Sequence, residues 1–129
     1  MANIGYFDIP ADNVDRAKHF YRTLLGWKIE PTKAGLDKEK AIASQYQDIM
    51  LGAPVEGTIN MGGMHKRMGI ETINNFVMVD DIDKPLAKVE KLGGKIVMPK
   101  DLIKGVGLVA MIQDTEGNVI GLWKPIMPM

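Results

Sequence analysis

Residues 12–31 have the sequence DNVDRAKHFYRTLLGWKIEP, and residues 80–99 have the sequence DDIDKPLAKVEKLGGKIVMP. The second stretch repeats the first at a fixed offset of 68 positions without a gap. An acidic helix cap, an apolar helix stripe, a glycine that ends a helix and a proline that closes a strand all recur in register. We therefore interpret the chain as two copies of one module. The alternative is two unrelated strand–helix units that share similar capping residues.

Each copy predicts one helix. In the first copy, Asp12 and Asn13 supply the N-cap and Gly26 ends the helix. Apolar residues at spacings of three and four form one stripe, made of Val14, Ala17, Phe20, Tyr21, Leu24 and Leu25. In the second copy, Asp80 and Asp81 supply the cap and Gly93-Gly94 end the helix. Its stripe consists of Ile82, Leu86, Val89 and Leu92.

Short apolar stretches bounded by glycine and proline predict the strands. They cover residues 4–9, 27–30, 41–51 and 58–64 in the first copy and 73–79, 95–98, 106–112 and 119–123 in the second. Each copy is then a βαβββ module, with module one at residues 1–68 and module two at residues 69–129. The predicted fold class is α+β, a single domain over residues 1–129 in which two tandem modules with curled mixed sheets form a cup. A cleft between two such sheets is a natural place for a ligand.

The composition excludes several classes of protein. Apolar residues make up 46% and charged residues 25% of the 129 residues, which is typical of a globular domain. The 16 basic and 16 acidic residues balance, so we expect neither nucleic acid nor a membrane surface as a partner. Since there is no cysteine, thiolate chemistry is excluded. We see no signal peptide and no apolar run of about 18 residues, and therefore expect a cytoplasmic protein.

Several motifs in order resemble one family. The first module opens with Asp8-Ile9-Pro10, the helix segment 16–21 and Leu25-Gly26-Trp27. The second opens with the segment 79–83 and Leu92-Gly93-Gly94, and Asp114-Thr115-Glu116-Gly117-Asn118 precedes the last strand. Over nearly the whole chain, this pattern resembles the glyoxalase/bleomycin-resistance/extradiol-dioxygenase superfamily, which has the vicinal-oxygen-chelate fold. Gly62-Gly63 and the segment 121–125 are similar to a poorly characterised glyoxalase-like branch.

The resemblance implies a homodimer and, in many members, a divalent metal ion held by His, Gln or Glu from the first and last strand of each module. Carried over to this sequence, three of those positions fall at Tyr6, Asn74 and Gly121, and the fourth falls within residues 60–63. Tyr, Asn and Gly are poor ligands for such metals. We therefore expect no metal cofactor, with an atypical divalent metal site as the alternative.

Two kinds of residue remain as candidates for chemistry. Asp8 has the same strand parity as Tyr6, so both side chains should lie on one face. A carboxylate among apolar walls holds a proton readily and is a candidate general base, whereas the alternative is a structural Asp8 bonded to its neighbours. His19 is expected on the solvated side of its helix. His65 is expected in a surface position at a sheet end, or at the mouth of the cup.

Three functions stay open at this point. The first is a small-molecule-binding protein that lacks the usual metal ligands. The second is a glyoxalase-related lyase or isomerase, with an atypical metal site or with Asp8 as general base, and the third is a partner-binding module. Whether the chain is an enzyme is left open, because functions are grafted onto folds. The expected ligand-binding residues are Tyr6, Asp8, Asn60, Gly62, Gly63, Asn74, Phe76, Met111, Gly121 and Trp123.

Overall fold

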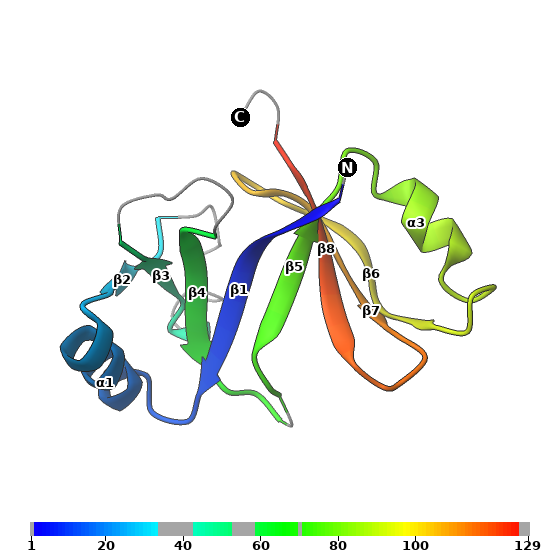
Figure 1. The fold of residues 1–129 in the computed structure, drawn as a ribbon. Coiled ribbons are helices and arrows are strands. Elements are labelled where there is room, and N and C mark those ends of the chain that lie inside the picture. The colour runs from blue at the N-terminus through cyan, green and yellow to red at the C-terminus, as the bar shows by residue number, and fades with distance from the viewer. Residues whose placement is uncertain (1, 34–42, 53–58, 70, 127–129) are drawn as a thin grey trace. The chain divides into compact units, whose positions relative to one another are not determined.

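The structure is a computed structural model that describes residues 2–33, 43–52, 59–69 and 71–126 (Figure 1). Its elements are β1 (Asn3–Ala11), α1 (Val14–Leu25), β2 (Lys28–Pro31), β3 (Gln47–Met50), β4 (Met61–Lys66), β5 (Asn74–Met78), α3 (Asp83–Lys88), β6 (Lys95–Ile103), β7 (Gly107–Gln113) and β8 (Val119–Pro125). No helix among these described residues is long and apolar enough to cross a membrane.

The chain divides into two compact units with the same internal topology. The first unit is Tyr6–Ile73, and the second consists of residues 1–5 and 74–129. In the first unit the strand order is β2-β3-β4-β1, with β1 parallel to β4 and the other pairs antiparallel. In the second unit the order is β6-β7-β8-β5, with β5 parallel to β8 and the other pairs antiparallel. The predicted α+β class with two βαβββ modules is therefore confirmed.

Helix α1 begins and ends at the predicted residues. The side chain of Asn13 accepts a hydrogen bond from the Arg16 N–H at 2.9 Å, which satisfies one of the unpaired amides of the first turn. Gly26 takes the left-handed conformation, with φ of 70°, and its N–H donates to the carbonyl of Arg22. Glycine ends the helix here because it adopts positive φ without a steric penalty.

Helix α3 departs from the exact repeat. Asp81 caps it, since its Oδ1 accepts from the N–H groups of Asp83 and Lys84. However, the helix ends at Lys88, and the left-handed glycine near its end is Gly93, with φ of 92°, rather than Gly94. Gly94 is needed for another reason: a Cβ there would lie 2.6 Å from the carbonyl oxygen of Gln113. The register of the repeat is therefore lost after the second helix.

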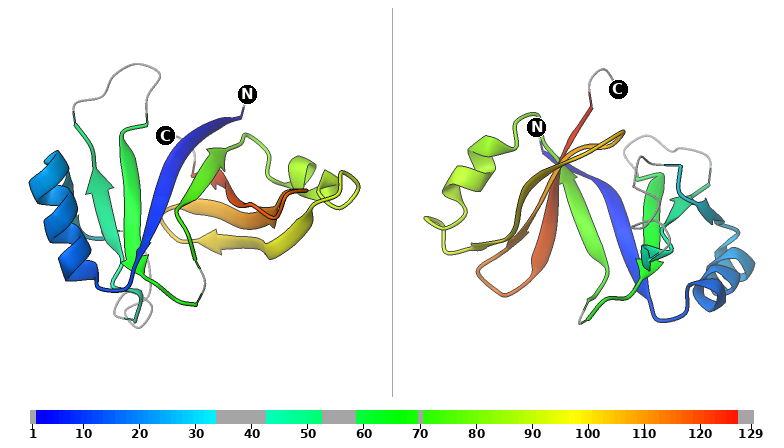
Figure 2. Two further views of the ribbon diagram at one scale, coloured as in Figure 1. Left: turned by 60° about the horizontal axis from the view of Figure 1, so that its bottom comes forward. Right: turned by 180° about the vertical axis from the view of Figure 1, so that it is seen from behind.

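Each helix packs on one face of its own sheet (Figures 1 and 2). The core of the first unit is formed by Ile9, Ala11, Val14, Ile29, Ile49 and Met64. That of the second unit is formed by Ile82, Ala110 and Leu122. The predicted helix stripes are only partly buried, because Phe20, Leu24 and Leu25 of α1, together with Leu92, are at least half exposed.

Several strand ends differ from the prediction. The strand predicted over residues 41–51 begins only at Gln47, since residues 43–44 are helical, and residues 41, 42 and 58 of the predicted strands lie outside the described residues. Two further differences occur at prolines. Strand β1 continues through Pro10 to Ala11, and β6 continues past Pro99 to Ile103. The pairing of β6 with β7 shifts register between Ile96 and Met98 and again before Asp101, and such an irregularity accommodates a proline that cannot donate a hydrogen bond. A strand prediction that stops at every proline is therefore too short here.

Candidate functional site

The first unit has a polar face on the side of its sheet opposite α1. Strand pairing places Asp8 beside Gly63 and Gly63 beside Asp48, and side chains two residues away on each strand share that face. We define the polar face as Tyr6, Asp8, Tyr46, Asp48 and His65. The alternate residues of the same strands, such as Ile9, Ile49 and Met64, belong to the core under α1. Strand alternation thus separates an apolar core from a face rich in groups that can bind or titrate.

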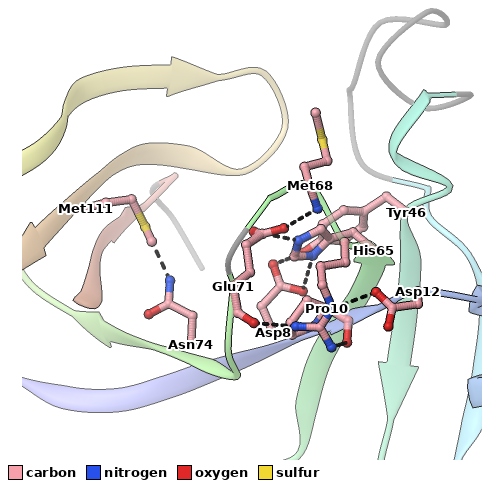
Figure 3. A network of polar contacts seen from close by, with 10 residues as sticks. Asp8, Pro10, Asp12, Tyr46, His65, Met68, Glu71, Asn74 and Met111 are labelled. Carbon is pink, nitrogen blue, oxygen red and sulfur yellow. Dashed lines mark hydrogen bonds and ion pairs between the residues drawn. The ribbon is translucent and has the colours of Figure 1, made fainter. Parts of the chain in front are cut away.

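A continuous chain of hydrogen bonds crosses this polar face, and Figure 3 shows its part from Tyr46 through Asp8 and His65 to Glu71. The hydroxyls of Tyr6 and Tyr46 are 2.7 Å apart, and the Tyr46 hydroxyl donates to Asp8 Oδ2 at 3.2 Å. The other oxygen of Asp8 lies 3.1 Å from His65 Nδ1. On its far side, His65 Nε2 lies 3.0 Å from Glu71 Oε2. Two phenols, two carboxylates and one imidazole are thereby linked in a single row.

The carboxylates of Asp8 and Glu71 determine which group donates each hydrogen bond in this row. An ionised carboxylate only accepts hydrogen bonds, and both ring nitrogens of His65 meet carboxylate oxygens. Both nitrogens must therefore carry a proton, which makes His65 an imidazolium. Since Tyr46 gives its only proton to Asp8, the bond between the two phenols is donated by Tyr6 to Tyr46.

The electrostatics of the row agree with this assignment. The hydrogen bond to Asp8, with the charges of Asp8 and Glu71, outweighs burial and raises the pKa of His65 to about 9. The Tyr46 ring stacks on the imidazole, with centroids 6.1 Å apart and planes 6° from parallel, which favours a cation. Burial first, and then the negative charge of Asp8, raise the pKa of Tyr46 far above its ordinary value. His65 is therefore charged, and Tyr46 remains a neutral donor, at neutral pH.

Glu71 is held by more than His65. Burial raises its pKa, but the Met68 N–H and the imidazolium of His65 outweigh that effect, and the pKa lies below its ordinary value. The Met68 N–H donates to Glu71 Oε1 at 2.6 Å, and the Arg67 guanidinium donates to the backbone carbonyl of Glu71. The segment that follows β4 is thus tied back to the end of that strand.

The second unit has a different face opposite its helix. Pairing places Phe76 beside Gly121, Gly121 beside Met111, and Trp123 beside both Met78 and Val109. We define the apolar face as Phe76, Met78, Val109, Met111 and Trp123. Its polar contacts include a hydrogen bond that Trp123 Nε1 donates to the carbonyl of Val106 at 3.0 Å, and Asn74 Nδ2 lies 3.4 Å from the sulfur of Met111. The face offers aromatic and thioether surface, which suits flat or greasy molecules.

The sequence matches one known protein family. The sequence model of the Glyoxalase/Bleomycin resistance protein/Dioxygenase superfamily matches residues 3–122. The chain belongs to this superfamily.

Curated members of the superfamily are longer than this chain. One relative is CFP32 of Mycobacterium tuberculosis and of Mycobacterium bovis, whose name describes it as a glyoxylase. It is 28% identical over 123 residues, covering 93% of this chain and 44% of that protein. The anthracycline biosynthesis protein DnrV of Streptomyces peucetius is 23% identical over 128 residues, covering 93% of this chain and 46% of that protein. The chain therefore spans less than half the length of these relatives.

Several solved structures share the fold. A methylmalonyl-CoA epimerase in complex with methylmalonyl-CoA and NH4+ has a TM-score of 0.70 at 12% identity, covering 98% of this chain and 96% of that one. A Streptomyces coelicolor methylmalonyl-CoA epimerase in complex with 2-nitronate-propionyl-CoA has a TM-score of 0.69 at 13% identity, covering 97% and 95%. At such identities the likeness shows the vicinal-oxygen-chelate fold and nothing about substrate.

The strand register relates Gly121, one of the positions that the resemblance assigns to a metal ligand, to a residue within the stretch 60–63 expected to hold the fourth position. Asp8 and Phe76 are 68 positions apart, and they pair with Gly63 and Gly121 respectively. Gly63 is therefore the counterpart of Gly121. The four positions carry Tyr6, Gly63, Asn74 and Gly121, so two of them offer no side-chain donor.

The space beside these two glycines is already filled. A Cβ on Gly63 would lie 2.2 Å from the hydroxyl of Tyr6 and 2.4 Å from that of Tyr46. A Cβ on Gly121 would lie 2.2 Å from the ring of Phe76. A ligating side chain does not fit at either position without movement of an aromatic neighbour. The residues present do not fit the metal of the superfamily.

The described acidic and histidine residues do not form a substitute site. Within residues 2–33, 43–52, 59–69 and 71–126, no group of three or more His, Cys, Asp and Glu side chains is arranged to hold a metal ion. His65 itself offers no lone pair, because both of its nitrogens donate to carboxylates.

The structure divides the predicted ligand-binding residues between the two units. Tyr6, Asp8 and Gly63 lie together on the polar face, and Asn74, Phe76, Met111, Gly121 and Trp123 lie together in the second unit. Gly62 faces the other way, where a Cβ would lie 2.5 Å from the ring of Phe7. Asn60 is exposed, and its carbonyl accepts from the Leu51 N–H.

Three residues of the row were missed or misjudged from sequence. His65 is not a surface residue: its side chain is 17% exposed and bonded at both nitrogens. The alternation of β4 from Gly63 to His65 could have placed it beside Asp8. Tyr46 precedes a strand whose register the sequence does not show, and Glu71 comes from an irregular segment with no sequence signal.

Proposed function

We propose that this protein binds a small organic molecule without a metal ion. The observation that carries the proposal is the filling of the two metal positions, Gly63 and Gly121, by aromatic side chains. The superfamily scaffold is retained while the groups that would hold a metal are replaced by groups that contact organic molecules. Membership of a superfamily that includes bleomycin resistance proteins supports a binding role.

The apolar face of the second unit supplies contact area for such a ligand. Phe76, Met111 and Trp123 share this face, and aromatic and thioether groups bury flat molecules favourably. An apolar surface of this kind is the usual main component of a site for an organic ligand. The polar face of the first unit, taken by itself, carries groups that form directional hydrogen bonds, among them Asp8.

Tryptophan fluorescence tests this proposal, because the chain has two tryptophans, one in each unit. The variant Trp27→Phe leaves Trp123 on the apolar face, and Trp123→Phe leaves Trp27, which stacks on Tyr21 with centroids 5.2 Å apart. N-phenyl-1-naphthylamine, a neutral aromatic probe, should quench Trp123 saturably in chelator-treated protein. Equal quenching of Trp27 and Trp123, or none of either, would contradict the proposal.

The alternative is a lyase or isomerase in which Asp8 is the general base. The observation in its favour is the position of Asp8 between Tyr46 and His65, which fixes both carboxylate oxygens. A base held in this way can remove a proton next to a carbonyl group of a substrate. Incorporation of solvent deuterium into α-hydroxy ketones or acyl thioesters, abolished in Asp8→Asn, would establish this function. Unchanged incorporation in Asp8→Asn would exclude Asp8 as the base.

A further inference from the structure

The carboxylate of Asp8 is partly exposed and has acceptor sites for further hydrogen bonds. Its side chain is 12% exposed, and each of its two oxygens accepts one hydrogen bond from the protein among the described residues. A carboxylate offers about four acceptor sites, so each oxygen can accept one further bond. Asp8 is therefore able to take a donor from a ligand with both oxygens already oriented.

The surroundings of Asp8 favour a donor and disfavour an anion. Asp8, Asp48 and Glu71 bring three negative charges to the polar face and the adjoining segment, against the positive charges of His65 and of Arg67, whose guanidinium donates to the Glu71 carbonyl. The influence of these carboxylates is visible in Tyr6, whose pKa is raised well above its ordinary value by burial and then by Asp8 and Asp48, against the opposing effect of Tyr46. A positively charged or N–H-bearing group meets a favourable potential there, whereas a carboxylate or phosphate meets an unfavourable one.

Unlike Asp8, His65 and Glu71 are not expected to contact a ligand directly, because their hydrogen-bonding groups are engaged within the protein. Both nitrogens of His65 are engaged, one with Asp8 and one with Glu71. Glu71 is engaged by His65 and by the Met68 N–H. These two residues therefore act through Asp8 by fixing the plane of its carboxylate.

We propose that Asp8 is a ligand-contacting carboxylate selective for molecules with a cationic or neutral N–H donor, and that His65 and Glu71 are positioning residues for it. This inference rests on the proposed ligand-binding function and, for the polar face of the first unit taken by itself, names the chemical class of the ligand. It also assigns roles to two residues, His65 and Glu71, outside the metal positions of the superfamily.

A matched pair of planar probes tests the ligand class. Benzamidine and benzoate have similar size, but the first is a cation with paired N–H donors and the second is an anion with paired acceptors. In NMR titrations of the whole chain, benzamidine should bind at least about tenfold more tightly than benzoate and shift the signals of Asp8, Tyr46 and His65. Preferential binding of benzoate, or an absence of benzamidine shifts at these residues, would overturn the assignment.

The variant Asp8→Asn checks that the effect belongs to this carboxylate. It should reduce benzamidine affinity by about tenfold or more, because the charge-assisted bonds are lost. The control is Asp83→Asn, which removes an exposed carboxylate paired with Lys100 in the second unit and should leave the affinity unchanged. Equal losses in both variants would mean that only net charge matters, and would overturn the role of Asp8.

Two substitutions of His65 separate positioning from simple charge. His65→Leu removes the donor and the positive charge, whereas His65→Gln removes the charge but keeps a donor for Asp8. Positioning predicts about tenfold weaker benzamidine binding in His65→Leu and near-normal binding in His65→Gln. If His65 acted only through its charge, both variants would bind benzamidine more tightly, and that result would overturn the positioning role.

These outcomes are distinct from failure of the proposed function. If N-phenyl-1-naphthylamine binds at Trp123 while benzamidine shows no preference, the ligand-binding function stands and the ligand class is wrong. If neither probe binds, both are contradicted. Dispersed amide spectra and thermal melting of each variant verify that it is folded.

Discussion

The two units share one topology, but on the side of the sheet away from the helix one unit is polar and the other is apolar. In the first unit that side carries a row of hydrogen-bonded titratable groups around Asp8 and His65. In the second unit the equivalent strands carry Phe76, Met111 and Trp123. The first strand shows the change most simply, since Asp8 in one unit corresponds to Phe76 in the other. A duplicated scaffold conserves which residues form the core, while the alternate residues are free to diverge in chemistry.

The glycines of the last strands give the largest expected difference in stability. Gly121→Ala should lower the free energy of unfolding by about 3 kcal/mol, because the added methyl overlaps the body of the Phe76 ring. Gly63→Ala should cost about 1 kcal/mol, because its methyl meets hydroxyl groups at the ends of two tyrosines, which can move. Urea denaturation of the two variants measures both values. Equal costs would show that Phe76 is less fixed than the structure indicates.

Removal of a polar side chain should affect the two units differently. Asp8→Ala should cost about 2 kcal/mol, since it leaves His65 and Tyr46 without their shared acceptor. In the second unit, Asn74→Ala should cost roughly 0.5 kcal/mol or less, because among the described residues Asn74 Oδ1 is buried without a hydrogen-bond partner. Denaturant midpoints measure both changes. A large loss in Asn74→Ala would mean that the second unit also depends on a polar network.

The stability of the protein should depend on pH through His65. Its pKa rises from an ordinary value of about 6.5 to about 9 in the folded protein, so the folded state binds the proton more tightly. The resulting stabilisation is complete below about pH 6.5 and is lost as the pH rises to about 9, and we expect it to amount to about 1–2 kcal/mol after screening by water. Melting temperatures across this range should fall in the wild type. The same fall in His65→Gln would assign it to another group.

The smallest expected effect concerns the outer end of the row. Glu71→Gln keeps a hydrogen-bond acceptor for His65 but removes a negative charge, so the pKa of His65 should fall while remaining raised by Asp8. The stability of the variant at neutral pH should change by less than about 1 kcal/mol. NMR titration of the His65 ring measures the pKa. An unchanged value would indicate that Glu71 contributes nothing to holding the imidazolium.

Local signals in the sequence were sufficient for the fold but not for the row of polar groups. The caps at Asn13 and Asp81 and the stop at Gly26 are governed by adjacent residues, and each is found in the structure. The superfamily and the α+β class also followed from such motifs. Asp8 and Tyr6 were placed on one face by strand parity alone. Tyr46 reaches Asp8 through pairing between distant segments, and no local pattern determines that register. Glu71 reaches His65 from an irregular segment six residues further along the chain, for which the sequence has no signal.

The central claim is that the superfamily scaffold binds its ligand here without a metal ion. The most direct measurement is the melting temperature of chelator-treated protein with Mn, Fe, Co, Ni and Zn, together with elemental analysis of the purified protein. A specific ligand of the folded state at about 100 times its dissociation constant stabilises by roughly 2.7 kcal/mol, which such an experiment detects readily. Our account predicts no metal-specific rise and no stoichiometric metal. A large rise with one metal would contradict it, and would mean that the aromatic groups beside Gly63 and Gly121 move to admit an atypical metal site.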